Sequence, residues 1–207
     1  MIAKGDVLEM VRKTLTPGQT AVDVGAATGD VCKVMRACVG PTGTVIAIEP
    51  RDTTIPYDVI RHTVACAGNT RTKPLYVPKG EGVRASLYRD AVLTKGDVET
   101  VMVPTAKLDD LVESADLVKI DVQGAEMSVL SGAKRLLQTC PVWILEVWPH
   151  GLLCAGESLQ GLWDKLHEVK LVPYTQHGAK IDYTDLSLWH MQRGSHQPFL
   201  NWWCKRA

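Results

Sequence analysis

The chain has 207 residues, of which 45% are hydrophobic and 22% are charged, and its formal net charge is zero. These values are typical of one globular domain with a buried core, and they give no support for a nucleic-acid or anionic-membrane partner. No apolar run approaches the roughly 18 residues of a membrane span, and residues 1–15 carry no leader pattern. We therefore expect a single cytoplasmic domain over residues 1–207, with no membrane span.

The first third of the chain alternates between helical and extended patterns. An apolar stripe at helical spacing ends at Pro17-Gly18, and a second stripe follows the first predicted strand. We expect helices over residues 7–15 and 31–38, and strands at Thr20–Val24, Thr44–Ile48 and His62–Cys66.

The remainder of the chain continues this alternation after a polar stretch. Residues 68–99 contain several glycines and predict at most a hairpin or a mobile loop, which we interpret as a variable, lid-like insertion. Residues 169–175 and 186–191 could form a closing antiparallel pair, and the aromatic tail at 199–203 is expected to pack against the domain. Further strands are expected at 101–104, 117–121 and 142–147, and helices at 108–112, 127–137 and 159–166.

This alternation predicts an α/β fold: a mostly parallel, Rossmann-like sheet with helices on both faces and an antiparallel closing strand. Ligands of such sheets bind beyond the carboxyl ends of the strands. The glycine-containing turn after the first strand and the acid Glu49 after the second strand are therefore a candidate nucleoside site, in which the carboxylate accepts bonds from the ribose hydroxyls. The predicted cofactor residues are Asp23, Gly25, Ala26, Ala27, Gly29, Glu49, Pro50, Cys66 and Asp121.

The first turn also discriminates between two classes of nucleoside cofactor. Nicotinamide cofactors favour G-x-G-x-x-G, whereas this turn reads Gly25-x-x-x-Gly29 and follows an acid, Asp23. A carboxylate would repel a pyrophosphate but attract a ligand that carries a sulfonium and an ammonium group. We therefore expect S-adenosylmethionine as the cofactor, and we expect no metal.

Longer segments resemble the FkbM-type methyltransferases, whose sequence after the fourth strand is close to K-I-D-V-E-G-x-E. The resemblance runs from Thr20 to Trp148, and it implies a class I methyltransferase fold and methyl transfer to a hydroxyl of a sugar or small natural product. Two departures stand out: Gln123 replaces the usual Glu, and the segment after Pro50 lacks the usual asparagine. The matching segments are Val22-Asp-Val-Gly25, Ile48-Glu49-Pro50, Val118-Lys-Ile-Asp121-Val-Gln-Gly124-Ala-Glu126, Leu130-Ser-Gly132-Ala133 and Pro141–Glu146.

Acids at the ends of the predicted central strands are candidates for catalysis. A hydroxyl that attacks the methyl group must lose its proton, which a nearby carboxylate can accept. Asp121 ends the fourth predicted strand and Glu146 lies near the end of the fifth. Glu126 and His150 complete the catalytic candidates, although Glu126 could serve only the helix dipole and His150 could lie in a surface loop. Lys119 is expected to pair with Asp121.

Three further functions stay open. The first turn also resembles the D-L-G-A-A-P-G-G loop of RNA ribose 2'-O-methyltransferases, although that class needs a basic groove and the net charge here is zero. The second function is that of a nicotinamide-dependent oxidoreductase, and the third is that of a non-catalytic scaffold. The expected partner is a small-molecule or saccharide acceptor rather than a nucleic acid, and the sequence leaves the acceptor and the oligomeric state open.

Overall fold

The structure is a computed structural model that describes residues 4–55, 58–80, 84–184 and 199–207. Its helices are α1 (Lys4–Thr14), α2 (Asp30–Val39), α3 (Leu108–Leu111), α4 (Glu126–Ser131), α5 (Leu136–Thr139), α6 (Pro149–Cys154) and α7 (Leu159–Glu168), with a 3-10 turn, η2, at Arg89–Ala91. Its strands are β1 (Thr20–Val24), β2 (Thr44–Ile48), β3 (Ile60–His62), β4 (Ala65–Cys66), β5 (Thr72–Pro78), β6 (Val98–Ala106), β7 (Leu117–Ile120), β8 (Val142–Val147), β9 (Leu171–Tyr174) and β10 (Leu200–Arg206). Among the described residues, no helix is both long and apolar enough to cross a bilayer.

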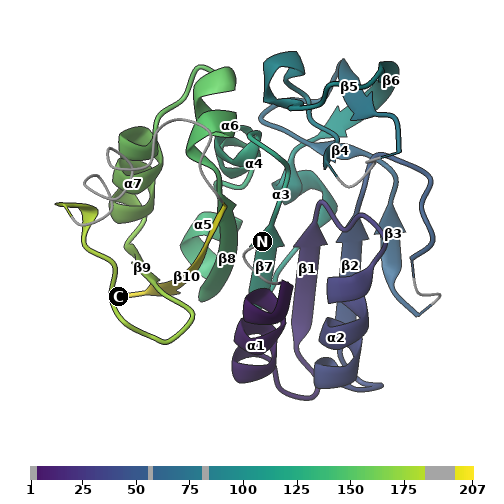
Figure 1. Cartoon of the computed structure of the whole chain (residues 1–207). Helices are drawn as coiled ribbons and strands as arrows, with labels where there is room; N and C mark the ends of the chain where they lie inside the picture. The colour runs from purple at the N-terminus through teal and green to yellow at the C-terminus, as the bar shows by residue number, and fades with distance from the viewer. Residues whose placement is uncertain (1–3, 56–57, 81–83, 185–198) are drawn as a thin grey trace.

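Within the described residues, the main sheet has seven strands in the order β3-β2-β1-β7-β8-β10-β9 (Figure 1). The pairs from β3 to β8 are parallel, and β10 is antiparallel to both of its neighbours. The chain runs outward from β1 to β2 and β3 and then returns to β7 on the other side of β1. This reversal of strand order between β1 and β7 confirms the predicted α/β fold and marks the expected position of a ligand site.

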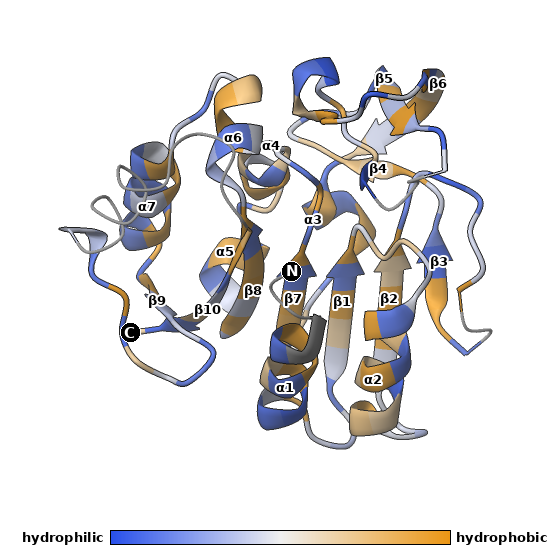
Figure 2. Cartoon of the chain, in the orientation of Figure 1, coloured by the Kyte–Doolittle hydropathy of each residue, from blue (hydrophilic) through white to orange (hydrophobic). Residues whose placement is uncertain are grey.

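Alternating side chains of the strands supply two cores, one on each face of the sheet. In β1, Ala21 packs with α1 and α2, whereas its neighbour Val22 packs with the helices of the opposite face. This alternation is the two-residue period of an extended strand buried on both sides. In Figure 2 the central strands are largely apolar, and the helices that flank them carry both apolar and polar residues.

A smaller sheet lies above the carboxyl ends of the parallel strands (Figure 1). It has the order β4-β6-β5, and β5 pairs with β6 in antiparallel register from Thr72↔Pro104 to Pro78↔Val98. The polar stretch at 68–99 therefore supplies one strand of this sheet and the start of another. The expected strand at His62–Cys66 is wrong as a single element, because its two ends are β3 of the main sheet and β4 of the smaller sheet.

The helix expected at 127–137 is also two elements, α4 and α5. Gly132 ends α4, and a Cβ there would lie 2.4 Å from the carbonyl oxygen of Ala67, so the chain passes this backbone too closely for a longer side chain. Helix α5 then begins at Leu136, and Asp109 caps its amino end. The Asp109 carboxylate accepts the N–H groups of Arg135 (2.7 Å) and Leu136 (3.1 Å).

The closing pair differs from the prediction as well. Strand β9 pairs with β10, which is the segment expected to be a packed tail, and the expected partner at 186–191 lies outside the described residues. Strand β10 also pairs with β8 over six residues, from Leu200↔Val147 to Lys205↔Val142. It thus lies inside the sheet rather than on its surface, and its aromatic side chains belong to the core.

Candidate functional site

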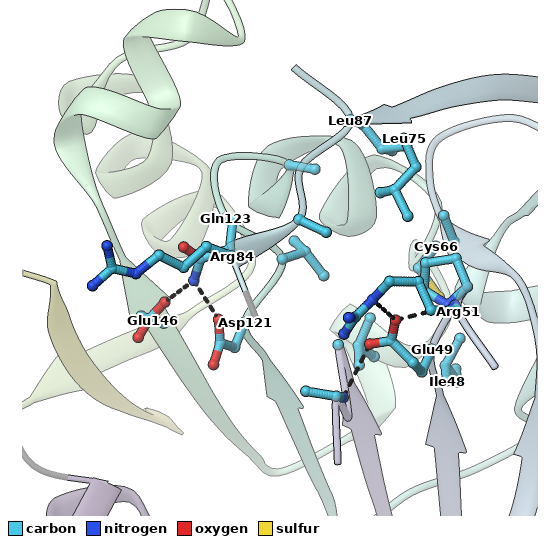
Figure 3. A pocket seen from close by; sticks show the side chains of 18 of the residues that line it. Ile48, Glu49, Arg51, Cys66, Leu75, Arg84, Leu87, Asp121, Gln123 and Glu146 are labelled. Carbon is cyan, nitrogen blue, oxygen red and sulfur yellow. Dashed lines mark hydrogen bonds and ion pairs between the residues drawn. The ribbon is translucent and has the colours of Figure 1, made fainter. Parts of the chain in front are cut away.

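A cavity of about 240 Å³ opens at the carboxyl ends of β1, β2, β7 and β8. It lies at the reversal of strand order, and residues of the smaller sheet and the segment after β5 form its outer wall (Figure 3). Its lining combines apolar side chains with acids at two separate places. The lining residues are Val24, Gly25, Ala27, Ile48, Glu49, Pro50, Arg51, Val64, Ala65, Cys66, Leu75, Arg84, Ala85, Leu87, Asp121, Val122, Gln123, Ala125, Glu146 and Phe199.

Glu49 is the acid at one end of the cavity. It follows β2 and is 4% exposed, and its Oε2 accepts the backbone N–H of Ala27 at 3.0 Å. Its Oε1 accepts the backbone N–H of Arg51 at 3.1 Å and the Arg51 Nε–H at 2.9 Å. The carboxylate is therefore fixed at the end of β2, where a ribose hydroxyl would compete with the Arg51 side chain for Oε1.

A second group of polar side chains lies at the opposite end (Figure 3). Asp121 follows β7, and Glu146 belongs to β8. The amide nitrogen of Gln123 lies between them, 2.8 Å from Asp121 Oδ1 and 2.7 Å from Glu146 Oε2. The structure thus brings together the two acids predicted at the ends of adjacent strands, and it adds an amide that bridges them.

A buried lysine lies beneath this pair. Lys119 Nζ is 3.0 Å from Asp23 Oδ1 and 3.4 Å from Asp121 Oδ2, and only 6% of its side chain is exposed. Burial alone would lower the pKa of Lys119, but the two carboxylates outweigh burial and raise it. The expected pairing of Lys119 with Asp121 is confirmed, and Asp23 is its second partner.

These charges act on the two acids in opposite directions. Burial and the negative charge of Asp121 raise the pKa of Glu146. For Asp121 burial also acts upward, but Lys119 and the hydrogen bonds from Glu146 and Gln123 lower its pKa overall. Near neutral pH, Asp121 is therefore the carboxylate of the pair and Glu146 carries a proton.

The turn after β1 approaches the chain after β7 very closely. Gly25 has φ +78°, and a Cβ there would lie 1.9 Å from the carbonyl oxygen of Asp121. Three of the predicted cofactor residues do not line the cavity: Ala26, Gly29, which precedes α2, and Asp23. Asp23 is fully buried and pairs with Lys119. Its carboxylate also accepts a hydrogen bond from the thiol of Cys32 in α2 at 3.3 Å. Gly25, Ala27, Glu49, Pro50, Cys66 and Asp121 do line the cavity.

Two of the catalytic candidates lie away from the cavity lining. Glu126 is 1% exposed, and its Oε1 accepts the backbone N–H groups of Val122 (3.3 Å) and Gly124 (3.1 Å), so it holds the turn after β7. Burial raises its pKa to about 7. His150 is in α6 rather than in a surface loop, where its ring packs 5.2 Å from that of Trp148.

Thirteen lining residues were not among the predicted site residues, and those with polar or aromatic side chains are Arg51, Arg84, Gln123 and Phe199. Arg51 follows Glu49 by two residues, so proximity in sequence was the available signal. Gln123 stands out in the sequence only as a departure from the family pattern, and its amide is chemically suited to bind two acids. Arg84 and Phe199 reach the site from segments with no motif, and the sequence holds no signal for them.

Comparison with known proteins agrees with this geometry. Residues 23–169 match the methyltransferase FkbM domain family, whereas no curated protein matches the sequence. The fold is similar to a protein from Clostridium thermocellum assigned as an rRNA methylase (TM-score 0.54, 10% identity, 100% of this chain and 99% of that chain). It is also similar to an rRNA methylase from Streptococcus thermophilus (TM-score 0.50, 10% identity, 100% and 99%).

A third solved structure is a protein from Streptococcus mutans assigned as a methyltransferase, in complex with SAH (TM-score 0.50, 10% identity, 100% of both chains). At such identities the likeness concerns the fold alone. The family match covers well over half of the chain and includes the end of β1 and all of β2, β7 and β8, whose carboxyl ends form the cavity. The chain therefore belongs to the FkbM methyltransferase domain family.

Proposed function

We propose that this protein transfers the methyl group of S-adenosylmethionine to a hydroxyl group of a saccharide or another small hydroxylated molecule. The observation that carries the proposal is the meeting of Asp121 and Glu146 at one end of a cavity whose other end holds Glu49. A pair of acids beside a nucleoside-type site supplies what a hydroxyl acceptor needs, which is a group to receive its proton.

The chemistry of the cavity fits the cofactor. Glu49 offers carboxylate oxygens to a ribose diol, and the adjoining wall of Ile48, Cys66 and Leu75 is apolar, as a flat adenine ring requires. Asp121 supplies negative charge for a cationic sulfonium, since Lys119 lies beneath it rather than in the cavity. When bound, S-adenosylmethionine supplies a methyl group that its sulfonium has already activated.

The residues of the chain then have two tasks. The cavity walls hold the acceptor oxygen in line with the methyl carbon, and positioning of this kind contributes up to roughly 7–11 kcal/mol to catalysis. Asp121 is the ionised acid of the pair and accepts the hydroxyl proton as the new carbon–oxygen bond forms. General-base assistance of this kind is worth roughly 10²–10⁴ in rate.

The charges at the acceptor end favour a neutral acceptor over RNA. Asp121 is the ionised acid there, and its negative charge repels the phosphates of a nucleic acid. The net charge of the chain is also zero. The likeness to rRNA methylases is a likeness of fold, and neither of these observations favours an RNA substrate.

The test is a transfer assay with methyl-labelled S-adenosylmethionine and a panel of hexoses, phenols and aliphatic alcohols, followed by Asp121→Asn. This substitution keeps the shape of the side chain and removes its charge. We expect turnover to fall about a hundredfold or more, because the proton acceptor is lost. The dissociation constant of S-adenosylhomocysteine, measured by calorimetry, should change less than tenfold.

The matched control is Asp164→Asn, at an exposed position on α7, which should leave both quantities unchanged. If no acceptor in the panel is methylated and S-adenosylhomocysteine does not bind the wild-type protein, the proposed function is wrong. If turnover survives Asp121→Asn and collapses in Glu146→Gln, Glu146 rather than Asp121 accepts the hydroxyl proton.

A further inference from the structure

Gln123 connects two acids that come from different strands (Figure 3). Its Nε2 lies 2.8 Å from Asp121 Oδ1 and 2.7 Å from Glu146 Oε2. An amide nitrogen carries two hydrogens, so this one group can donate to both carboxyls at the same time. Gln123 is 8% exposed, and water therefore competes little for these bonds.

The backbone of Gln123 has a conformation that residues with side chains seldom adopt. Its φ is +53°, in the left-handed region, and such a residue persists only where its surroundings enforce the conformation. Two contacts hold this conformation: the buried Ser86 hydroxyl donates to the Gln123 carbonyl at 2.7 Å, and Glu126 Oε1 accepts the N–H groups of Val122 and Gly124. The backbone of Gln123 is thus fixed, and its side-chain amide lies between the two acids.

Charged groups from several elements face the pair. Lys119 of β7 lies 3.4 Å from Asp121 Oδ2 and also binds Asp23 of β1. Glu126 of α4 lies behind the turn and acts on both acids as a further negative charge. Arg84, from the segment after β5, lines the same end of the cavity (Figure 3). Lys119 therefore favours an ionised Asp121, whereas the neighbouring acids oppose a second negative charge on Glu146.

We propose that Gln123 is a positioning residue that holds Asp121 and Glu146 as a pair sharing one proton, and that this pair is the base for the acceptor hydroxyl. The inference rests on the proposed function for its catalytic part. The acceptor oxygen gains the methyl carbon as the carbon–sulfur bond breaks, and the hydroxyl proton moves to Asp121. The pair loses its negative charge in the same step in which the sulfonium loses its positive charge, so the transfer does not change the net charge of the site.

The test is a carbon-13 NMR titration of the protein labelled at the Asp and Glu side-chain carboxyls. The Glu146 signal is assigned by its loss in Glu146→Gln and the Asp121 signal by its loss in Asp121→Asn. In the wild type we expect Glu146 to be protonated at pH 7 and to ionise above pH 8, whereas Asp121 should already be ionised at pH 4. If Glu146 is ionised at pH 7, the shared proton is excluded.

Gln123→Met then removes the bridging amide at nearly constant volume. The two carboxyls can move apart, and we expect their titration midpoints to approach each other by at least one pH unit, a tenfold change in proton affinity. Gln138→Met, at an exposed position on α5, should leave both midpoints in place. Unchanged midpoints in a folded Gln123→Met protein would show that Gln123 does not position the pair.

Gln123→Asn tests the length of the side chain separately from the backbone conformation at this position. Asparagine tolerates positive φ well, but its side chain is one methylene shorter and cannot span both carboxyls. We expect it to shift the midpoints as Gln123→Met does. The titration needs no methyl acceptor, so it tests whether Asp121 and Glu146 share a proton even if the protein binds no S-adenosylhomocysteine. If the protein binds S-adenosylhomocysteine but Glu146 is ionised at pH 7, the proposed function stands and the shared proton is excluded.

Discussion

Glu49 shows how one side chain can organise both a loop and a binding site. Its Oε2 accepts the N–H of Ala27, whose φ of +48° is unusual for a residue with a side chain. Its Oε1 holds the main chain and the side chain of Arg51. The acid therefore fixes the turn after β1 and the segment after β2 before any ligand arrives, and preorganisation of this kind lowers the cost of binding.

We predict that Glu49→Gln weakens the binding of S-adenosylhomocysteine by about 1.5–3 kcal/mol, the usual value of a hydrogen bond to a charged group. Glutamine is nearly isosteric, so the turn keeps an acceptor for Ala27 while the charge is lost. Calorimetry provides the measurement, with Glu168→Gln, at an exposed position on α7, as the control. An unchanged affinity in the folded variant would show that Glu49 does not bind the ribose.

Gly25 is a poor probe of the same site, although it lines the cavity. A Cβ at this position would collide with the backbone of Asp121 before it reached any ligand. A larger residue would therefore push β1 and β7 apart, and a loss of binding would report this damage. Gly25 lies where the turn after β1 passes the backbone after β7, and this close approach is a structural reason for a glycine here.

At the scale of single residues, the sequence predicted acids better than their partners. Glu49, Asp121 and Glu146 could be predicted because each lies at or just beyond the end of an apolar strand, and parallel strands bring their carboxyl ends to one edge. Asp23 was predicted to bind the cofactor, and the structure places it outside the cavity lining and against Lys119, nearly a hundred residues away in sequence. Gln123 was overlooked because an amide acts here only through the geometry of two other side chains.

At the scale of elements, the polar stretch at 68–99 divides into a paired part and an arm. Strand β5 is fully paired with β6. The arm at 84–97 contains one described short helix, η2, and one described β-bridge, Tyr76↔Ser86, joins it to β5. Arg84, Ala85 and Leu87 of this arm line the cavity. The cavity of about 240 Å³ is smaller than the roughly 300–1,000 Å³ of typical ligand sites, and movement of the arm would enlarge it.

We predict that the arm at 84–97 is a lid. In hydrogen exchange without ligand, its amides should exchange much faster than those of β5 and β6, because few of them are paired within the sheet. Addition of S-adenosylhomocysteine should slow exchange in the arm and leave α7 unchanged, which provides the internal control. Full protection of the arm in the free protein would mean that it is a fixed wall of the cavity.

Elements with a clear period were predictable, and those defined by distant contacts were not. Strands β1, β2, β7 and β8 and helices α2 and α7 follow apolar patterns of two or 3.6 residues, and the structure confirms them. The break between α4 and α5 depends on the approach of Gly132 to Ala67 and on the cap from Asp109. Neither contact leaves a periodic signal, because each joins residues far apart in sequence.

At the scale of the whole molecule, β10 decides how the sheet is completed. It lies between β8 and β9 and is antiparallel to both, so the last described segment of the chain is an interior strand. Its Trp202 is 1% exposed and packs edge-on against Trp163 of α7 at 6.0 Å. Sequence patterns describe neighbours along the chain, and a strand that inserts between two earlier ones cannot be distinguished from a surface tail in this way.

We therefore predict that Trp202→Ala lowers the free energy of unfolding by about 3–5 kcal/mol, the usual cost of removing a large aromatic side chain from a core. Urea denaturation followed by circular dichroism is the measurement. Leu153→Ala, at an exposed position on α6, should change stability by no more than about 0.5 kcal/mol. Trp202→Phe should cost less than Trp202→Ala, because the buried Trp202 Nε1 has no hydrogen-bond partner to lose among the described residues. A cost below about 1 kcal/mol for Trp202→Ala would instead mean that the side chain of Trp202 is not part of the core.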